Sequence, residues 1–209
     1  LDEMKKLLYR STRFSYCLLL ALSLPIILKM DYILHLWLKD VPDYTTGFCQ
    51  LVLVSSLVST LSNLMAQVAR AYGKIRNYQV VVSLFLVLNF PLSFIVLKFG
   101  FSPLSTMCVN IGIQSLLLLV RLAMTGKMIR MTSMDFIKNV LVQVSSVTLA
   151  SIIFPVILCS LLDNSFLDFI CVSIVSFGCV CLATYCLGMN RNERQYIVSM
   201  LLKGVNKKR

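Results

Sequence analysis

The chain has 209 residues, of which 58% are hydrophobic and 14% charged, and its formal net charge is +11. Soluble domains contain about 45–50% apolar residues, so this composition excludes an ordinary soluble domain and predicts an integral membrane protein. The positive charge does not indicate nucleic-acid binding, because the basic residues border hydrophobic runs and are not interleaved with exposed aromatic residues. We expect membrane lipids, with their anionic headgroups, as the partners of these residues.

Six apolar runs are long enough to span a bilayer, which requires about 20 residues of α-helix. Strands of a membrane barrel alternate in polarity, whereas these runs are continuously apolar, and helices are therefore expected. The predicted fold is an all-α integral membrane protein, with a membrane bundle over residues 1–190 and a tail over residues 191–209. The predicted helices cover about residues 12–30, 46–68, 78–98, 103–124, 136–162 and 166–188.

Basic residues cluster in alternate gaps between these runs. The clusters precede the first run, separate the second from the third and the fourth from the fifth, and follow the sixth. They comprise Lys5, Lys6, Arg10, Arg13, Arg70, Lys74, Arg76, Arg121, Lys127, Arg130, Lys138, Arg191, Arg194, Lys203, Lys207, Lys208 and Arg209. Because positively charged loops stay in the cytoplasm, the pattern predicts that both ends of the chain are cytoplasmic.

The first apolar run is interrupted at Lys29, Met30 and Asp31. The following segment, residues 32–38 with Trp37, is predicted to lie at the outer membrane interface, the depth that Trp and Tyr prefer. We expect Lys29 to extend to the outer headgroups, with an ion pair to Asp31 as the alternative. His35 in this segment has no second ligand-type cluster nearby, and a metal site is not predicted.

Two of the predicted helices each carry a stripe of polar residues on one face. In the second helix the stripe leads to Arg70, and it consists of Ser56, Thr60, Asn63 and Gln67. In the fourth helix it consists of Thr106, Asn110, Gln114 and Arg121. Such residues either hydrogen-bond across packed membrane helices or line a hydrated path for a polar substrate. On the second interpretation the substrate-path candidates are Asn63, Gln67, Asn110, Gln114 and Arg121.

Pro25, Pro91 and Pro155 fall within the first, third and fifth predicted helices. A proline inside a helix removes one backbone hydrogen bond and strains the preceding turn. We therefore expect bent helices at these positions, and the three prolines are hinge candidates. Beyond Gly188, apolar residues recur at helical spacing among basic ones, which predicts a short amphipathic helix on the cytoplasmic leaflet.

No Ser/His/Asp set, carboxylate pair or metal-binding motif occurs in the sequence, and Asp and Glu are nearly absent from the apolar runs. The eight cysteines lie mostly within these runs and form no CxxC motif. We interpret them as small, buried, reduced thiols. The sequence thus predicts a protein that is not an enzyme and that binds neither a metal nor a cofactor.

Four stretches carry a resemblance to a known family: LHLWLKDVP (residues 34–42), AYGKIRNYQ (71–79), NFPLS (89–93) and VRL (120–122). With these stretches the chain resembles the C-terminal portion of bacterial polysaccharide and O-antigen flippases, the Wzx-like branch of the MATE-like multidrug/oligosaccharidyl-lipid/polysaccharide exporters. The resemblance implies that the chain supplies the last six helices of a larger transporter, whose N-terminal helix bundle would be its partner. None of the four stretches is a catalytic signature.

The function implied by the resemblance is translocation of a lipid-linked oligosaccharide across the bacterial inner membrane. The cargo would be the undecaprenyl-pyrophosphate-linked repeat unit of a surface polysaccharide such as the O-antigen of lipopolysaccharide. Alternatives are a multidrug or cation exporter of the same superfamily, a membrane-embedded polysaccharide polymerase or acyltransferase, and a membrane scaffold without transport activity. A polymerase or acyltransferase would be expected to have a large polar loop, and the loops here are short.

Overall fold

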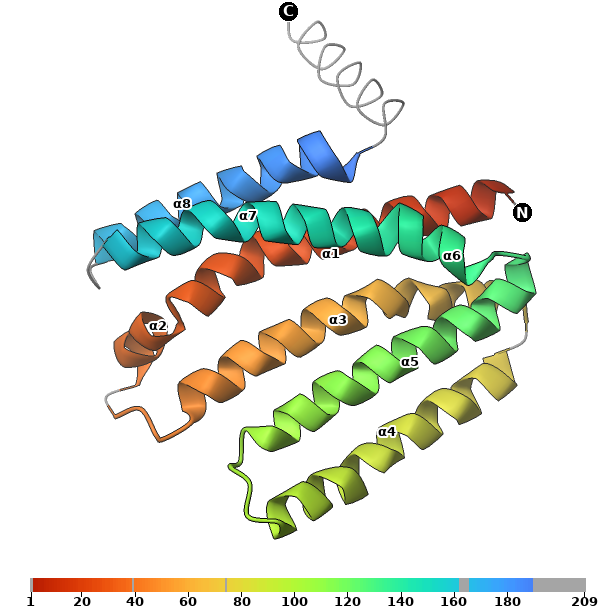
Figure 1. Cartoon of the computed structure of the whole chain (residues 1–209), viewed down its shortest axis with the longest axis horizontal. Helices are drawn as coiled ribbons and strands as arrows, with labels where there is room; N and C mark the ends of the chain where they lie inside the picture. The colour runs from red at the N-terminus through yellow and green to blue at the C-terminus, as the bar shows by residue number, and fades with distance from the viewer. Residues whose placement is uncertain (1, 39, 74, 162–165, 190–209) are drawn as a thin grey trace, which may run out of the picture.

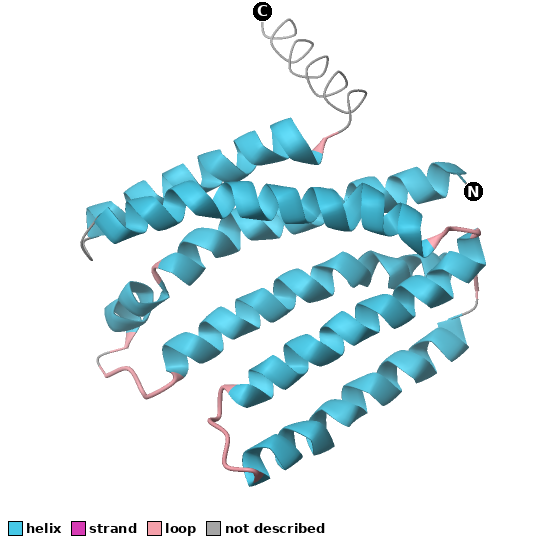
Figure 2. Cartoon of the chain, viewed as in Figure 1, coloured by secondary structure: helices cyan, strands magenta, loops and turns pink. Residues whose placement is uncertain are grey.

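The computed structural model describes residues 2–38, 40–73, 75–161 and 166–189. Within these ranges the chain forms helices and contains no strand (Figure 2). The elements are α1 (Asp2–Leu28), α2 (Met30–Trp37), α3 (Thr45–Ala71), α4 (Ile75–Lys98), α5 (Ser105–Ile129), α6 (Ser133–Phe136), the π-helical turn η1 (Ile137–Leu141), α7 (Val142–Leu161), α8 (Phe166–Ala183) and the π-helical turn η2 (Thr184–Gly188).

Six helices in the described part of the chain are long and apolar enough to cross a membrane, which confirms the predicted fold class. The fifth span combines α6, η1 and α7, and the sixth combines α8 and η2. The predicted amphipathic helix in residues 191–209 lies outside the described residues. The two π-helical turns were not predicted from the sequence.

Two helix boundaries differ clearly from the predictions. Helix α1 begins at Asp2 and not near residue 12, and α5 continues to Ile129, past the predicted end near residue 124. Lys and Arg are good helix formers, and their long side chains reach water from a helix that continues through the headgroup region. The first and third basic clusters therefore lie largely on helices. The predicted interfacial segment is helix α2, whose Trp37 is 81% exposed.

The order of the helices across the bundle places α1 near its centre (Figure 1). Helix α1 contacts α3 on one side and α7 and α8 on the other, while α5 lies between α3 and α4. Helix α4 is the outermost member, and Tyr78 and Val82 are its buried residues. The remaining surface of α4 is available to lipid or to another protein segment.

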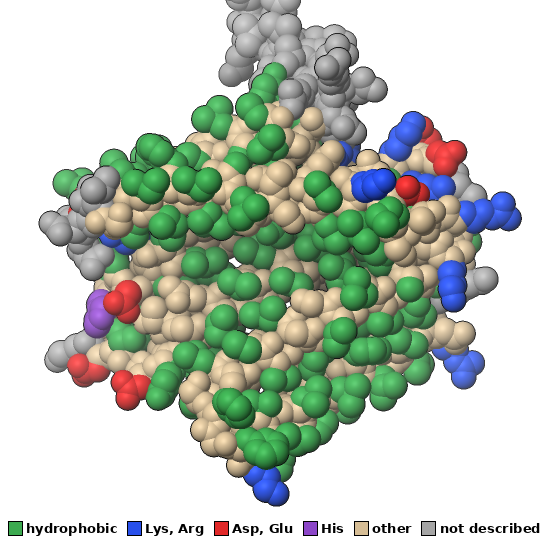
Figure 3. Space-filling view, in the orientation of Figure 1, with side chains coloured by type: hydrophobic (Ala, Val, Ile, Leu, Met, Phe, Trp, Pro, Cys, Tyr) green, Lys and Arg blue, Asp and Glu red, His purple; other side chains and the backbone are tan. Residues whose placement is uncertain are grey.

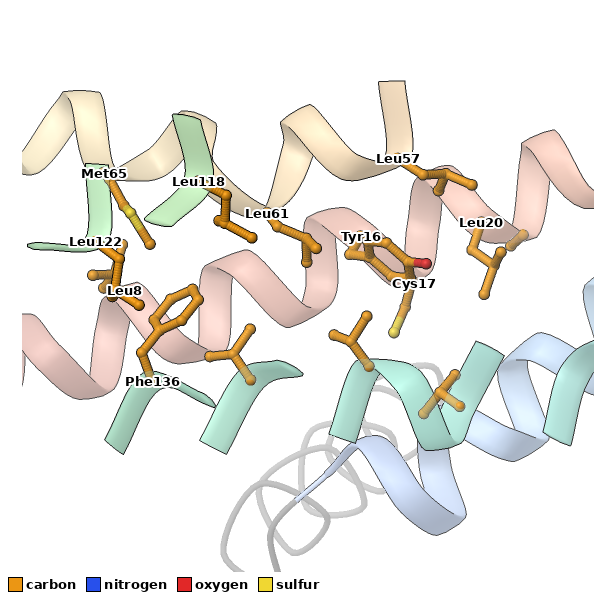
Figure 4. Close-up of a cluster of buried hydrophobic side chains, with 14 of the residues drawn as sticks. Leu8, Tyr16, Cys17, Leu20, Leu57, Leu61, Met65, Leu118, Leu122 and Phe136 are labelled. Atoms are coloured by element: carbon orange, nitrogen blue, oxygen red, sulfur yellow. The ribbon is translucent and has the colours of Figure 1, made fainter. Parts of the chain in front are cut away.

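The main hydrophobic core surrounds α1 (Figure 4). Tyr16 of α1 lies near Leu61 of α3 and Leu20 lies near Leu57, while Phe136 points toward Leu8 from the opposite side. A second, smaller cluster joins α3, α4 and α5. Because α3 and α5 contribute to both clusters, they connect α4 to the rest of the bundle.

Charged side chains lie mainly at the two ends of the helices, with a hydrophobic band between them (Figure 3). Most of the visible Lys and Arg side chains lie at the end where α1 begins, and His35 lies at the opposite end. We call the former the basic end; the positive-inside rule predicts that it is cytoplasmic.

Tight turns return the chain at both ends of the bundle. Gly73 and Gly100 lie in these turns with positive φ angles of 71° and 83°, at which other residues would be strained.

We expect Leu122→Ala to lower the free energy of unfolding by about 2–5 kcal/mol. Leu122 is 2% exposed in the main core, and its truncation leaves a cavity. The matched control is Leu119→Ala on the same helix, because Leu119 is 54% exposed and its truncation should change stability by about 0.5 kcal/mol or less. Unfolding titrations in mixed detergent micelles would measure both values. Equal losses would contradict the assignment of these two leucines to opposite faces of α5.

Candidate substrate path

The polar stripe predicted in the fourth spanning helix contacts α3 at two levels along α5. Near the middle of α3, the Ser55 hydroxyl donates a hydrogen bond to Oδ1 of Asn110, with 3.2 Å between the oxygens. Nearer the basic end, Nη1 of Arg121 donates to Oγ of Ser62 at 3.0 Å and to Oδ1 of Asn63 at 3.3 Å. Three of the five candidates, Asn63, Asn110 and Arg121, therefore take part in side-chain hydrogen bonds between α3 and α5.

The residues of the two stripes fall into two groups, those hydrogen-bonded within the bundle and those exposed on its surface. Asn110 is half-buried and bonded across the helices, as expected of a packing contact. Ser56 and Thr60 donate to carbonyl groups of their own helix, both at 2.8 Å, and need no partner elsewhere. Asn63 and Gln67 are exposed. The exposed part of the stripe is thus the part with capacity to bind a further molecule.

Gln114, the remaining candidate, is half-buried on α5 between the levels of Asn110 and Arg121. Between Gln114 and Arg121 the same face carries the buried residues Leu117 and Leu118, so the two polar contacts of α5 with α3 are separated by an apolar section. Gln67 lies one turn beyond Asn63, toward the basic end, and lines a cleft between α3 and α1. The five candidates thus follow the length of α3 and α5 and do not form one compact pocket.

The charge of Arg121 is held by neutral groups. Within the described residues the ion pairs are Lys5–Asp2 and Lys6–Glu3, both near the start of α1. Arg121 is half-buried, and its Nε atom is buried without a hydrogen-bond partner in that part of the chain. Hydrogen bonds that a guanidinium group donates to hydroxyl and amide oxygens orient it but do not neutralise it, so Arg121 presents an oriented cation to an anion.

Arg121 lies two turns before the end of α5 at Ile129, about 12 Å along the helix axis. A side chain at this depth could extend alone to the interface, and the sequence left that possibility open. In the structure the guanidinium group lies against Ser62 and Asn63 of α3 at the same level. Its position is therefore set by a neighbouring helix.

Tyr78 is a residue of this region that the sequence analysis missed. Its ring packs in the second cluster with Ala69 of α3 and Leu117 of α5, and it is 1% exposed. Its hydroxyl is buried without a hydrogen-bond partner in the described residues. A tyrosine close to the start of a spanning helix was the available sequence signal.

A second polar contact, between α1 and α7, was also missed. Arg13 was assigned to the basic cluster before the first helix, but it is 5% exposed and donates a hydrogen bond from Nη1 to Oε1 of Gln143. One turn further along α1, the hydroxyls of Tyr16 and Thr148 are 3.1 Å apart and hydrogen-bonded. Arg13 was grouped with the basic residues that precede the first apolar run, but it is buried because α7 packs against this turn of α1.

The expectation that Lys29 reaches the outer headgroups is also wrong. Lys29 is 4% exposed, because α2 turns back against the outer ends of α1 and α3. The carboxylate of Asp31 accepts a hydrogen bond from the Thr46 hydroxyl at 2.9 Å. Helix α2 and its contacts therefore cover the end of α1 opposite the basic end.

The hinge candidates all lie inside helices: Pro25 in α1, Pro91 in α4 and Pro155 in α7. Pro25 and Pro155 are buried, while Pro91 is exposed on the outermost helix. A hinge role remains a prediction for each of them. The fifth span also contains η1, and π-helical turns frequently occur at functional sites.

The described residues contain no group of three or more His, Cys, Asp or Glu side chains placed to hold a metal ion. Of the eight cysteines Cys17 alone is fully buried, and Cys108, Cys171, Cys181 and Cys186 are exposed on the bundle surface. The prediction that the cysteines are buried was therefore wrong for these four. Apolar helices can expose a thiol to lipid, because Cys behaves as a small hydrophobic residue.

Comparisons of the chain with protein-family models, curated proteins and solved structures found no match. A function must therefore be argued from the chemistry of the residues. Arg121, a cation oriented by neutral ligands beside an exposed polar stripe, is the feature with the most specific chemical consequence.

We expect cysteines introduced at Asn63 and Gln67 to react with a membrane-impermeant, water-soluble thiol reagent in a variant that lacks the native cysteines. Both positions are exposed on the polar stripe, and a hydrated path would admit the reagent. Met65→Cys is the control, because Met65 lies between them in sequence and is 0% exposed. Protection of all three positions would show that the stripe is covered and would contradict the hydrated-path interpretation.

Proposed function

We propose that this chain is part of a flippase that moves lipid-linked oligosaccharides across the bacterial inner membrane. The cargo would be an undecaprenyl-pyrophosphate-linked repeat unit of a surface polysaccharide. The proposal is supported by the sequence resemblance described above and, above all, by the environment of Arg121. Six apolar helices supply the membrane-spanning framework that such a transporter requires.

Retaining a charge at the depth of Arg121 has an energetic cost. A central Arg in a spanning helix costs about 2.5–3.5 kcal/mol on insertion scales, and such residues usually have a functional reason. The hydrogen bonds that Arg121 donates to Ser62 and Asn63 reduce this cost without cancelling the charge. A pyrophosphate group is the natural complement, because a guanidinium group binds phosphate oxygens with paired, charge-assisted hydrogen bonds.

The exposed stripe on α3 fits the sugar portion of the same cargo. Sugars present many hydroxyl groups, and the side-chain amides of Asn63 and Gln67 offer both donors and acceptors. Asn63 also contacts Arg121 directly, so a diphosphate and its first sugar could be bound side by side. No covalent chemistry is needed for this function.

We expect Arg121→Gln to reduce export of the surface polysaccharide by about tenfold to a hundredfold in a cell that depends on this protein. The substitution removes charge-assisted hydrogen bonds, each worth about 1.5–3 kcal/mol. Lipid-linked repeat units should accumulate in the cytoplasmic leaflet, where mass spectrometry of extracted lipids would detect them. Lys127→Gln is the control, because it removes one positive charge from an exposed position on the same helix.

Normal export by the Arg121→Gln variant, or equal defects in both variants, would contradict the proposed role of Arg121. Normal export after deletion of the whole protein would overturn the flippase assignment. If deletion instead abolished efflux of an organic cation, the protein would be a multidrug or cation exporter of the same superfamily.

A further inference from the structure

A cleft of about 460 Å³ lies between α1 and the last span, which combines α8 and η2. Its lining is mainly apolar. Leu18 and Leu22 of α1 and Phe177 of α8 line it, and each of them is more than half exposed. The cleft is therefore open along the surface of the bundle, where the chain of a lipid can enter it from the side.

The cleft extends over most of the hydrocarbon depth of one leaflet. Along α1 it reaches from Phe14 to Leu22, a rise of about 12 Å. The hydrocarbon core of a bilayer is about 30 Å thick, so one leaflet contributes about 15 Å. Phe14 directly follows the last basic residue of α1, Arg13, and Met189 lines the cleft where the sixth span ends. The cleft thus begins near the basic end and continues into the apolar part of the bundle.

A guanidinium group contacts the wall of this cleft at the basic end. Arg10 precedes Phe14 by one helical turn, and its guanidinium carbon lies 5.7 Å from the centroid of the Phe14 ring. This distance is typical of a cation–π contact, and the ring itself lines the cleft. A guanidinium group has five N–H donors, so a group stacked on a ring can also bind phosphate oxygens. The apolar cleft therefore has a cation at its mouth.

We propose that the cleft holds one acyl chain of an anionic phospholipid from the leaflet at the basic end, with the lipid phosphate bound by Arg10. The acyl chain packs against Leu18, Leu22 and Phe177. Basic pockets between membrane helices bind anionic headgroups, because Lys and Arg near the surface attract them. A helical segment about 10 Å wide and 12 Å long would occupy about 900 Å³, about twice the volume of the cleft, so a single chain fits better. The proposal does not depend on the flippase function.

Native mass spectrometry of the full chain in neutral detergent tests the role of the headgroup. The probes are phosphatidylglycerol and phosphatidylcholine with identical acyl chains. We expect phosphatidylglycerol to bind about fivefold more tightly, and Arg10→Gln to abolish this preference, since one basic residue contributes about 1 kcal/mol. The matched control, Arg76→Gln, should keep the preference, because Arg76 is exposed on α4 and does not line the cleft. Equal affinities for the two lipids, or a preference that persists in Arg10→Gln, would overturn the proposal.

A substitution that fills the cleft tests the position of the acyl chain. Cys181→Trp places a large ring in the cleft and should abolish binding of both lipids. Cys171→Trp is the control, because Cys171 is also exposed on α8 but does not line the cleft, and equal helix content by circular dichroism would show that both variants fold. Binding that survives Cys181→Trp, or that both variants lose equally, would contradict the proposed position. Absence of phosphatidylglycerol binding by the unsubstituted chain would also overturn the proposal, and is expected if another segment or a second copy of the chain covers the cleft.

Discussion

Hydrocarbon offers no hydrogen-bond partner to a polar group, and the architecture of this chain depends on that constraint. Backbone groups satisfy it by forming helices throughout the described spans. Side chains satisfy it in two ways. Ser56 and Thr60 bond to carbonyl groups of their own helix, while Tyr16 and Thr148 bond to each other across two helices. The second kind of contact also determines which helices pack together.

Arg121 meets the same constraint differently from these neutral groups. Its partners on α3 position it but leave its charge uncompensated within the described residues. An arginine that serves only packing can be replaced by an apolar residue at little cost or with a gain in stability. The charge of Arg121 therefore favours a role in binding an anion, and the exposed amide of Asn63 beside it favours a polar, sugar-containing ligand.

The number and type of the spanning helices could be predicted from the sequence, because hydropathy responds directly to the bilayer. Helix ends were predicted less well, since basic residues such as Lys5 and Arg10 look like loop residues but continue a helix through the headgroup region.

The polar stripes could be predicted from the spacing of their residues, but their hydrogen-bond partners on the neighbouring helix could not. The spacing identified Asn110 and Arg121, but Ser55 and Ser62 emerged only when α3 and α5 were placed side by side. Arg13 and Lys29 were misplaced because burial depends on how α7 and α2 pack, which the sequence of one helix does not determine.

The central claim is that the charge of Arg121 recognises the diphosphate of a lipid-linked cargo, and equilibrium binding to the purified protein tests it most directly. The ligands are a polyprenyl diphosphate and the neutral polyprenol with the same chain. The account predicts that the diphosphate binds at least tenfold more tightly than the polyprenol, and that Arg121→Gln abolishes this difference while polyprenol binding is unchanged. A preference for the diphosphate that persists in the Arg121→Gln variant would contradict the account.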